Sequence, residues 1–389
     1  MHLILLSILS KYDTILVVWW GTGWHIQPIV NISWELKDKK LLWLGWTNSE
    51  EEKVAGENSI PFKSISTLKL ATTKSPKLLL YPFVLIQGIL QARKILRSVI
   101  VKHETIHVPN FQKPGSLSSF AVLRRKDRTS RWQKSNTPIC VFSKGWPGSV
   151  AIGIAAWMLG IPLYIHESDT IPGRSSRILG RFADTIFLGF ESAKQYFQSE
   201  KCEVIGQILS ASFAKEVPEG RRIFRENQEK ISHTPLHKEG INWKTNRTHI
   251  LVICWSQWSQ AIFEAIMEQF SSSDKYEWII ALGKLNEWMK QDFEKMKNIQ
   301  AFEWISQEDM ASLLTNTDLA ITRGSATTLA EIDIFWIKKI IIPLPHSAWD
   351  HQYWNAKEYE KNGDILLEQK NLNQLTEILK ELCQKITNR

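Results

Sequence analysis

The chain has 389 residues, of which 43% are hydrophobic and 23% charged, and its net charge is +8. A chain of this length is too long for one ordinary hydrophobic core and suits two domains. The composition excludes disordered and fibrous proteins. The four cysteines lie far apart without a C-x-x-C pair, which argues against a disulfide framework, a zinc site or a redox motif.

Short apolar runs rich in β-branched residues alternate with helical patterns along the chain. The runs that predict strands are residues 15–18, 41–44, 139–142, 163–165, 185–188, 250–253, 278–281, 319–322 and 340–342. Because they are continuously apolar, both faces of each strand are predicted to be buried, as in a parallel sheet covered by helices. The pattern predicts an α/β protein with two Rossmann-like, doubly wound domains that face each other across a cleft.

We place an N-terminal domain at residues 1–205 and a second domain at 206–370. The last segment, 371–389, has helical periodicity and is predicted to pack back on the first domain. Two polar segments with Pro and Gly, 103–137 and 214–247, interrupt the pattern and read as surface insertions. The first is strongly basic. It has no nucleic-acid-binding motif, so a solvated or membrane-facing loop is favoured over an RNA-binding one.

Two apolar segments could interact with a membrane, and both are short. The apolar opening, residues 1–10, lacks a basic start and a cleavage site, and reads as a leader into the first strand. The longest apolar run, 78–90, contains Pro82 and falls short of the ~18 residues that a spanning helix needs. It predicts either a buried helix or an interfacial segment, with the basic stretch beyond it meeting anionic headgroups.

The first candidate site is the stretch 319–331. A buried strand is predicted to end at Thr322, and a helix to start near Ala326. Free N–H groups at that helix start suit a diphosphate. Glu331, one and a half turns into the helix, could accept hydrogen bonds from ribose hydroxyls as an ionised carboxylate. A capped helix with a solvated Glu remains the alternative.

Three further loops carry polar groups after predicted strands. Thr22, Gly23 and His25 follow the first strand, and His25 is either a general base for a sugar hydroxyl or a structural histidine. Residues 166–169 (His-Glu-Ser-Asp) follow the strand at 163–165 and read as a ligand site or an Asx turn. Residues 346–355 hold Gln352, which could face a nucleotide. No metal-ligand cluster is apparent, so no metal is expected in catalysis.

Together these segments resemble the MurG family, the bacterial transferases that add N-acetylglucosamine to undecaprenyl-linked muramyl-pentapeptide (lipid I) and so make lipid II. The similarity rests on the Gly-Thr-Gly-x-His loop and on residues 160–167, 171–173, 256–257, 323–331 and 351–356. It implies a GT-B fold, with the acceptor on the N-terminal domain and UDP-GlcNAc on the second. It also implies metal-independent, inverting transfer without a cofactor, at the cytoplasmic face of the plasma membrane, with an apolar membrane contact at 78–90.

The resemblance assigns residues to roles. His25 becomes the base for the acceptor 4-hydroxyl, and His166 and Glu167 line the acceptor side. Ile305 would lie against uracil, and Glu331 would hold the ribose. The donor-binding set is Thr22, Gly23, Trp24, Asp169, Ser210, Ser256, Gln257, Ile305, Arg323, Ala326, Thr327, Thr328, Leu329, Ala330, Glu331 and Gln352. The implied partners are UDP-GlcNAc, lipid I and an anionic membrane surface, with no nucleic acid.

The chain departs from the family pattern at several points. Asp169 stands at a family Asn, Ser210 at a diphosphate-binding Arg, and Ser325 at a Gly. Trp occurs 18 times against 19 Gly, although average usage puts Gly near ~7%. The Trp residues at family Gly positions are Trp19, Trp20, Trp24, Trp146, Trp255, Trp258 and Trp336, with Trp46 and Trp349 as weaker cases.

A Trp in a glycine loop brings a large indole into space that the ligand or a facing helix needs. Either the chain is an inactive, membrane-associated homologue, or the gene uses UGA for glycine and was translated with UGA as Trp. We favour the second hypothesis, because the other motif residues are largely intact. A related GT-B transferase with another lipid acceptor remains an alternative. A dinucleotide oxidoreductase is disfavoured, since no acidic residue clearly ends the second strand near Trp43.

Overall fold

The computed structural model describes most of the chain and divides it into two compact units. The described residues are 3–19, 27–65, 81–106, 138–145, 147–210, 212–213, 241, 243, 247–254, 258–270 and 275–387. The first unit comprises Met1–Glu167 and Pro172–Ile205, and the second comprises Ser168–Ile171 and Gly206–Arg389. The division at residue 205 coincides with the predicted domain boundary, except that the short segment 168–171 groups with the second unit.

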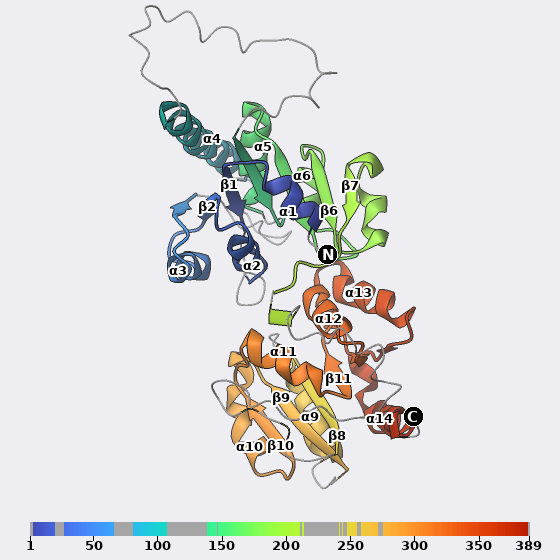
Figure 1. The fold of residues 1–389 in the computed structure, drawn as a ribbon. Helices are drawn as coiled ribbons and strands as arrows, with labels where there is room; N and C mark the ends of the chain where they lie inside the picture. Colours follow the sequence, from blue (N-terminus) through green and yellow to red (C-terminus); the bar gives the residue numbers. More distant parts are fainter. Residues whose placement is uncertain are drawn as a thin grey trace, which may run out of the picture. The chain divides into compact units, whose positions relative to one another are not determined.

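The first unit is built on a seven-stranded parallel sheet in the order β3-β2-β1-β4-β5-β6-β7 (Figure 1). Its strands are β1 Thr14–Val18, β2 Lys40–Gly45, β3 Phe62–Ser64, β4 Ile139–Ser143, β5 Leu163–Glu167, β6 Thr185–Leu188 and β7 Cys202–Val204. The helices are α1 Leu3–Leu9, α2 Gln27–Glu35, α3 Glu50–Glu57, α4 Tyr81–Ile106, α5 Ser149–Leu159 and α6 Arg174–Leu179. The order reverses direction beside β1, as in doubly wound folds.

The second unit repeats the plan with a six-stranded parallel sheet in the order β10-β9-β8-β11-β12-β13. Its strands are β8 Thr248–Ile253, β9 Tyr276–Ala281, β10 Ile299–Phe302, β11 Leu319–Thr322, β12 Lys338–Ile341 and β13 Ile365–Leu366. The helices are α9 Gln260–Phe270, α10 Lys290–Glu294, α11 Gln307–Thr315, α12 Ala326–Asp333, α13 His351–Glu360 and α14 Leu375–Thr387. The predicted α/β class with two parallel doubly wound domains is therefore confirmed, while the predicted cleft stays a prediction.

The C-terminal helix packs in the core of the second unit. Leu375, Leu379, Leu382 and Cys383 of α14 are buried in the core of the second unit, together with strands β8, β9 and β11. These residues are spaced i, i+4, i+7 and i+8, so they form one apolar face of the helix. That face packs against the second sheet. The helix therefore packs on the second domain, and its predicted packing on the first stays a prediction.

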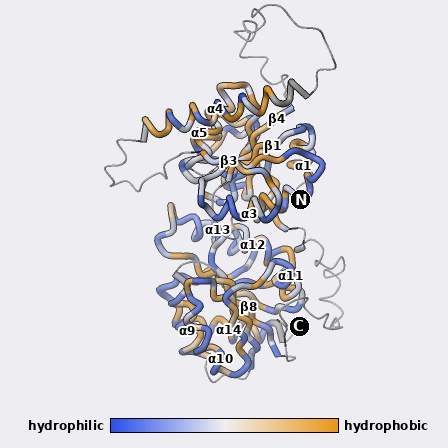
Figure 2. Tube along the Cα trace, turned by 90° about the vertical axis from the view of Figure 1, so that its left-hand side faces the viewer, coloured by the Kyte–Doolittle hydropathy of each residue, from blue (hydrophilic) through white to orange (hydrophobic). Residues whose placement is uncertain are grey.

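The apolar run 78–90 was predicted to be either a buried helix or an interfacial segment. The structure describes its residues 81–90, which form the start of helix α4. Phe83, Ile86 and Leu90 are exposed, whereas Ala92 and Leu96 are buried in the first core. Hydrophobic residues recur along α4 in Figure 2. The helix is therefore not buried all round, but leaves an apolar face open to solvent. Among the helices that the structure describes, none is long and apolar enough to cross a membrane.

Candidate functional site

The turn between β11 and α12 presents the start of a helix as a candidate anion site. Strand β11 lies between β8 and β12, so its carboxyl end is fixed in the middle of the sheet. Ser325 caps α12 in an extended conformation, and its side chain makes no capping hydrogen bond. The first-turn N–H groups of a helix have no intrahelical acceptor. Such N–H groups suit an anion, which the helix dipole also favours.

Close packing holds this turn against helix α13. A Cβ atom on Gly324 would lie 2.2 Å from the backbone oxygen of Gln352, so no side chain fits at residue 324. The Oε1 atom of Gln352 accepts a hydrogen bond from the Leu344 N–H at 2.9 Å. This bond orients the Gln352 amide, and its NH2 group is the end that can donate to a ligand.

Asn355 joins three chain segments at the same place. Its Oδ1 atom accepts from the Thr170 N–H at 2.9 Å and from the Thr170 hydroxyl at 3.0 Å. Its Nδ2 atom donates to Asp169 Oδ1 at 2.9 Å and to the Gly324 oxygen at 3.0 Å. Because all four hydrogen-bonding positions of this fully buried amide are filled, the segment 168–171 is tied to the turn ahead of α12. The Oδ1 atom of Asp169 therefore already accepts a hydrogen bond from within the protein.

Glu331 lies on the second turn of α12 and is 5% exposed. Burial raises the pKa of its carboxyl to about 8, because a carboxylate loses its hydration there. The side chain is therefore mostly neutral at pH 7, and not ionised as we expected from the sequence. A neutral carboxyl can still donate one hydrogen bond and accept another, which suits a pair of ribose hydroxyls.

Arg323 has its guanidinium turned into the protein. Its Nη1 atom donates to the Ile342 oxygen at 3.1 Å and to Gln369 Oε1 at 2.9 Å, and its Nη2 atom donates to the Trp258 oxygen. The residue is 3% exposed. Arg323 therefore ties the segment before α9 to the strand ends of β11 and β12. This arrangement fits a positioning role better than direct contact with a ligand.

The other predicted donor residues divide into three groups. Thr327 is half-buried at the helix start, whereas Ala326, Thr328, Leu329 and Ala330 are buried. Ile305 is completely buried and Ser210 nearly so, and the Ser210 hydroxyl accepts from the Ser212 N–H at 3.3 Å. The structure brings Asp169 close to Gly324 through Asn355, but it leaves the Ile305 side chain in the core. Thr22, Gly23, Trp24, His25, Ser256 and Gln257 lie outside the described residues.

The predicted acceptor residues lie in the first unit. His166 and Glu167 are the last residues of β5, and both are buried. They stand at the carboxyl end of a parallel strand, where α/β proteins bind ligands. The basic insertion 103–137 lies outside the described ranges after residue 106, as does most of 214–247. Within the part of the chain that is described, no group of three His, Cys, Asp or Glu side chains could hold a metal ion.

Sequence reasoning missed Asn355 and Thr170 as parts of the site. The signal for Asn355 was its place three residues after Gln352, which puts both on one face of α13. No local pattern in the sequence predicted that Thr170, 185 residues away, would donate hydrogen bonds to Asn355. The positioning role of Arg323 was equally hidden, because its acceptors are mostly backbone oxygens.

Two parallel, doubly wound units of this topology define the GT-B class of nucleotide-sugar enzymes. The Glycosyltransferase family 28 C-terminal domain matches residues 249–389, and the N-terminal domain of that family matches residues 15–105 and 99–188. Together these matches span most of the chain, which belongs to glycosyltransferase family 28 and, within it, to the MurG family. It is an enzyme that uses a UDP-sugar as substrate.

Two relatives share the name UDP-N-acetylglucosamine–N-acetylmuramyl-(pentapeptide) pyrophosphoryl-undecaprenol N-acetylglucosamine transferase. The protein of Sulfurihydrogenibium sp. (strain YO3AOP1) is 25% identical, with 95% of this chain and 88% of the relative aligned. That of Finegoldia magna is 27% identical, with 93% and 88% aligned.

Solved structures agree on the fold. MurG of Acinetobacter baumannii has a TM-score of 0.64 at 19% identity, covering 95% of this chain and 92% of its own. The UDP-GlcNAc 2-epimerase of Neisseria meningitidis, bound to UDP-GlcNAc, has a TM-score of 0.54 at 13% identity, covering 95% and 93%. Since a transferase and an epimerase share the architecture, the fold alone does not separate the two activities.

Proposed function

We infer that the enzyme transfers N-acetylglucosamine from UDP-GlcNAc to undecaprenyl-pyrophosphoryl-MurNAc-pentapeptide (lipid I) and so forms lipid II. The relatives with which the chain aligns over more than nine tenths of its length carry this activity in their names. One structural observation supports the donor half of the reaction. The uncapped start of α12, with buried Glu331 on the next turn, offers a diphosphate site and a ribose site on the same helix.

The proposed chemistry is a single displacement. His25 takes the proton of the acceptor 4-hydroxyl, and the oxygen attacks the anomeric carbon as the bond to UDP breaks, which inverts that carbon. The N–H groups at the start of α12, with Thr327, hold the departing diphosphate, and Gln352 donates its NH2 group to the nucleotide. Glu331 holds the ribose. No metal or other cofactor is required, because the helix start supplies the positive end of a dipole.

Two residues position this donor site without touching the donor. Asn355 fixes the segment 168–171 and the Gly324 turn relative to each other, so the first-turn N–H groups of α12 have one direction. Arg323 fixes the segment at Trp258 ahead of α9. His166 and Glu167 serve the acceptor side from the end of β5. The donor roles of Ser256 and Gln257 rest on the family resemblance.

We further propose that α4 contacts the cytoplasmic face of the bacterial plasma membrane, which would make the enzyme a peripheral membrane protein. Phe83, Ile86 and Leu90 are spaced i, i+3 and i+7, and Lys94 and Arg97 continue the same face. An apolar stripe followed by exposed cations suits a surface of acyl chains and anionic headgroups. The undecaprenyl acceptor is held in such a surface.

The test compares acceptors. Purified enzyme is given UDP-GlcNAc with lipid I or with diacylglycerol in the same detergent micelles, and released UDP is measured. The proposal expects UDP release with lipid I only. Release with diacylglycerol instead would assign the chain to a related GT-B transferase, and release with neither would leave a catalytically inactive homologue. Diacylglycerol is the matched control, because it supplies a lipid hydroxyl without the muramyl sugar.

A further inference from the structure

Three tryptophans occupy backbone positions that favour glycine. Among the described residues other than glycine, eight have a positive φ, and three of them are Trp258 at 114°, Trp336 at 55° and Trp349 at 58°. The other five are Asn, Ser, His and Asp residues, and Asn, Asp and His are the types most often found there. A bulky side chain with positive φ is an outlier, because its Cβ crowds the neighbouring carbonyl oxygen.

Trp336 lies at a turn for which this fold elsewhere uses glycine. After α5 the chain passes through Gly160, with a φ of 69°, and enters β5. After α13 it passes through Gly363, with a φ of 90°, two residues before β13. The turn from α12 has Trp336 in the left-handed region two residues before β12. A glycine after a helix end is the usual way to make this reversal.

Trp258 and Trp349 are fixed in equally demanding positions. The φ of 114° at Trp258 lies beyond the left-handed helical region that Asn and Asp can enter. Its carbonyl oxygen is held by Arg323, so the peptide cannot rotate freely. Trp349 has φ 58° and ψ 22° and is followed by Asp350 in the same region. Two successive left-handed residues without a glycine are unusual.

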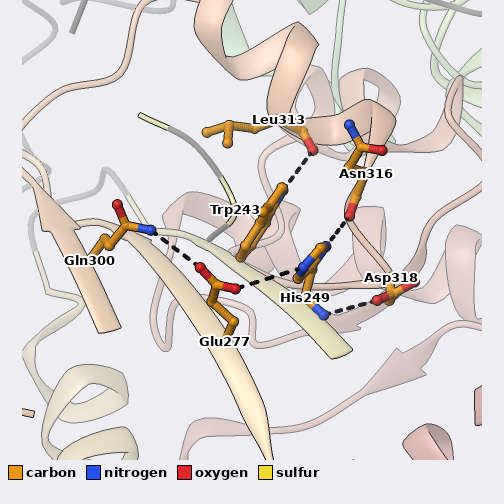
Figure 3. Close-up of polar contacts among 7 residues, drawn as sticks. All are labelled: Trp243, His249, Glu277, Gln300, Leu313, Asn316 and Asp318. Carbon is orange, nitrogen blue, oxygen red and sulfur yellow. Dashed lines mark hydrogen bonds and ion pairs between the residues drawn. The ribbon is translucent and has the colours of Figure 1, made fainter. Parts of the chain in front are cut away.

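These three tryptophan residues are also exposed to solvent, at 73%, 49% and 55%. Some other tryptophans are buried and well packed, although Trp34, Trp288, Trp304 and Trp354 are exposed to a similar extent. Trp243 is 4% exposed, stacks on His249 at 4.4 Å, and donates its Nε1–H to the Leu313 oxygen at 3.4 Å (Figure 3). Trp43 and Trp278 are at most 1% exposed. Backbone conformation therefore separates Trp258, Trp336 and Trp349 from the other described tryptophans, none of which has a positive φ.

We propose that residues 258, 336 and 349 are glycine in the protein that the native host makes, encoded by UGA codons that the host reads as glycine. Residues 43, 243 and 278 are genuine tryptophans. This assignment explains the backbone conformation at the three positions and contributes to the near equality of 18 Trp and 19 Gly. It does not rest on the proposed transferase activity. Trp19 and Trp46 have no positive φ, and Trp20, Trp24, Trp146 and Trp255 lie outside the described residues, so this argument assigns none of these six.

Tryptic peptides of the native protein test the assignment directly. Residues 324–338 form a peptide with Trp336 as its single tryptophan, and residues 276–284 form a control peptide with buried Trp278. We expect the mass of the first peptide to correspond to glycine at 336 and that of the control to tryptophan at 278. The peptide 340–357 should show one replacement, at 349 and not at 354. Tryptophan at 336 in the native peptide would overturn the proposal.

A second experiment uses recombinant protein, and in it substitution of three large side chains by glycine is expected to raise the melting temperature. Replacing Trp258, Trp336 and Trp349 together by Gly should raise the melting temperature by roughly 5 °C or more, because each change relieves a strained conformation. The matched control replaces Trp43, Trp243 and Trp278 by Gly and should lower it strongly. A lower melting temperature in the first triple variant would contradict the assignment. Neither result depends on enzyme activity.

Discussion

Glu331→Gln should make the protein more stable, and by more at high pH than at low pH. The folded pKa of Glu331 is raised from its ordinary 4.5 to about 8 by burial. Between these values the native state binds a proton that the unfolded state has released, so stability falls as pH rises. Each pKa unit is worth about 1.4 kcal/mol. The burial therefore opposes folding by about 3 kcal/mol at pH 7 and by roughly 5 kcal/mol above pH 8.

A glutamine of the same shape removes this titration, so the advantage of the variant should grow as the carboxyl of the parent ionises. Thermal unfolding at pH 5 and pH 8 measures it. We expect nearly equal melting temperatures at pH 5 and a gap of roughly 10 °C at pH 8. Glu381→Gln, at an exposed position on α14, is the control and should show no such growth. A gap that is the same at both pH values would refute the burial argument.

Two other substitutions test the positioning and membrane proposals. Asn355→Asp should raise the KM for UDP-GlcNAc at least tenfold, because it places a carboxylate against Asp169 and loses two donated hydrogen bonds. Adding Asp169→Asn restores a donor and should recover most of the loss in KM. A double variant with an equally high KM would contradict the positioning role of Asn355. Replacing Phe83 and Leu90 on α4 by Glu should weaken binding to vesicles containing anionic phospholipid at least tenfold. Leu285→Glu, at an exposed apolar position of the second unit, should leave vesicle binding unchanged, and equal losses in the two variants would argue against α4.

The sequence predicts the interior of both sheets but not their edges. All nine predicted strands occur, and they are the five interior strands of the first sheet and the four interior strands of the second. The four strands that it missed, β3, β7, β10 and β13, are the sheet edges. Interior strands are buried on both faces and therefore appear as continuous apolar runs. Edge strands are short and half-exposed here, so their sequences resemble loops.

The candidate site divides in a similar way. The turn before α12 was predictable, because a buried strand followed by Gly324 and a helical pattern is a local signal. The four hydrogen bonds of Asn355 were not, because they join residues 31 and 185–186 positions apart. The neutral state of Glu331 was also hidden, since the pKa depends on burial by residues distant in sequence. The packing of α14 in the second core was hidden for the same reason: the apolar face in the sequence shows that the helix packs, but not on which domain.

Identification of the product tests the central claim most directly. The purified enzyme would be incubated with UDP-GlcNAc and lipid I in the presence of a metal chelator, and the lipid and nucleotide products would be separated and their masses measured. The account predicts a lipid heavier by one N-acetylhexosamine, formed in equal amount with UDP. Conversion of UDP-GlcNAc into an isomer, or loss of the sugar to water with lipid I unchanged, would contradict it.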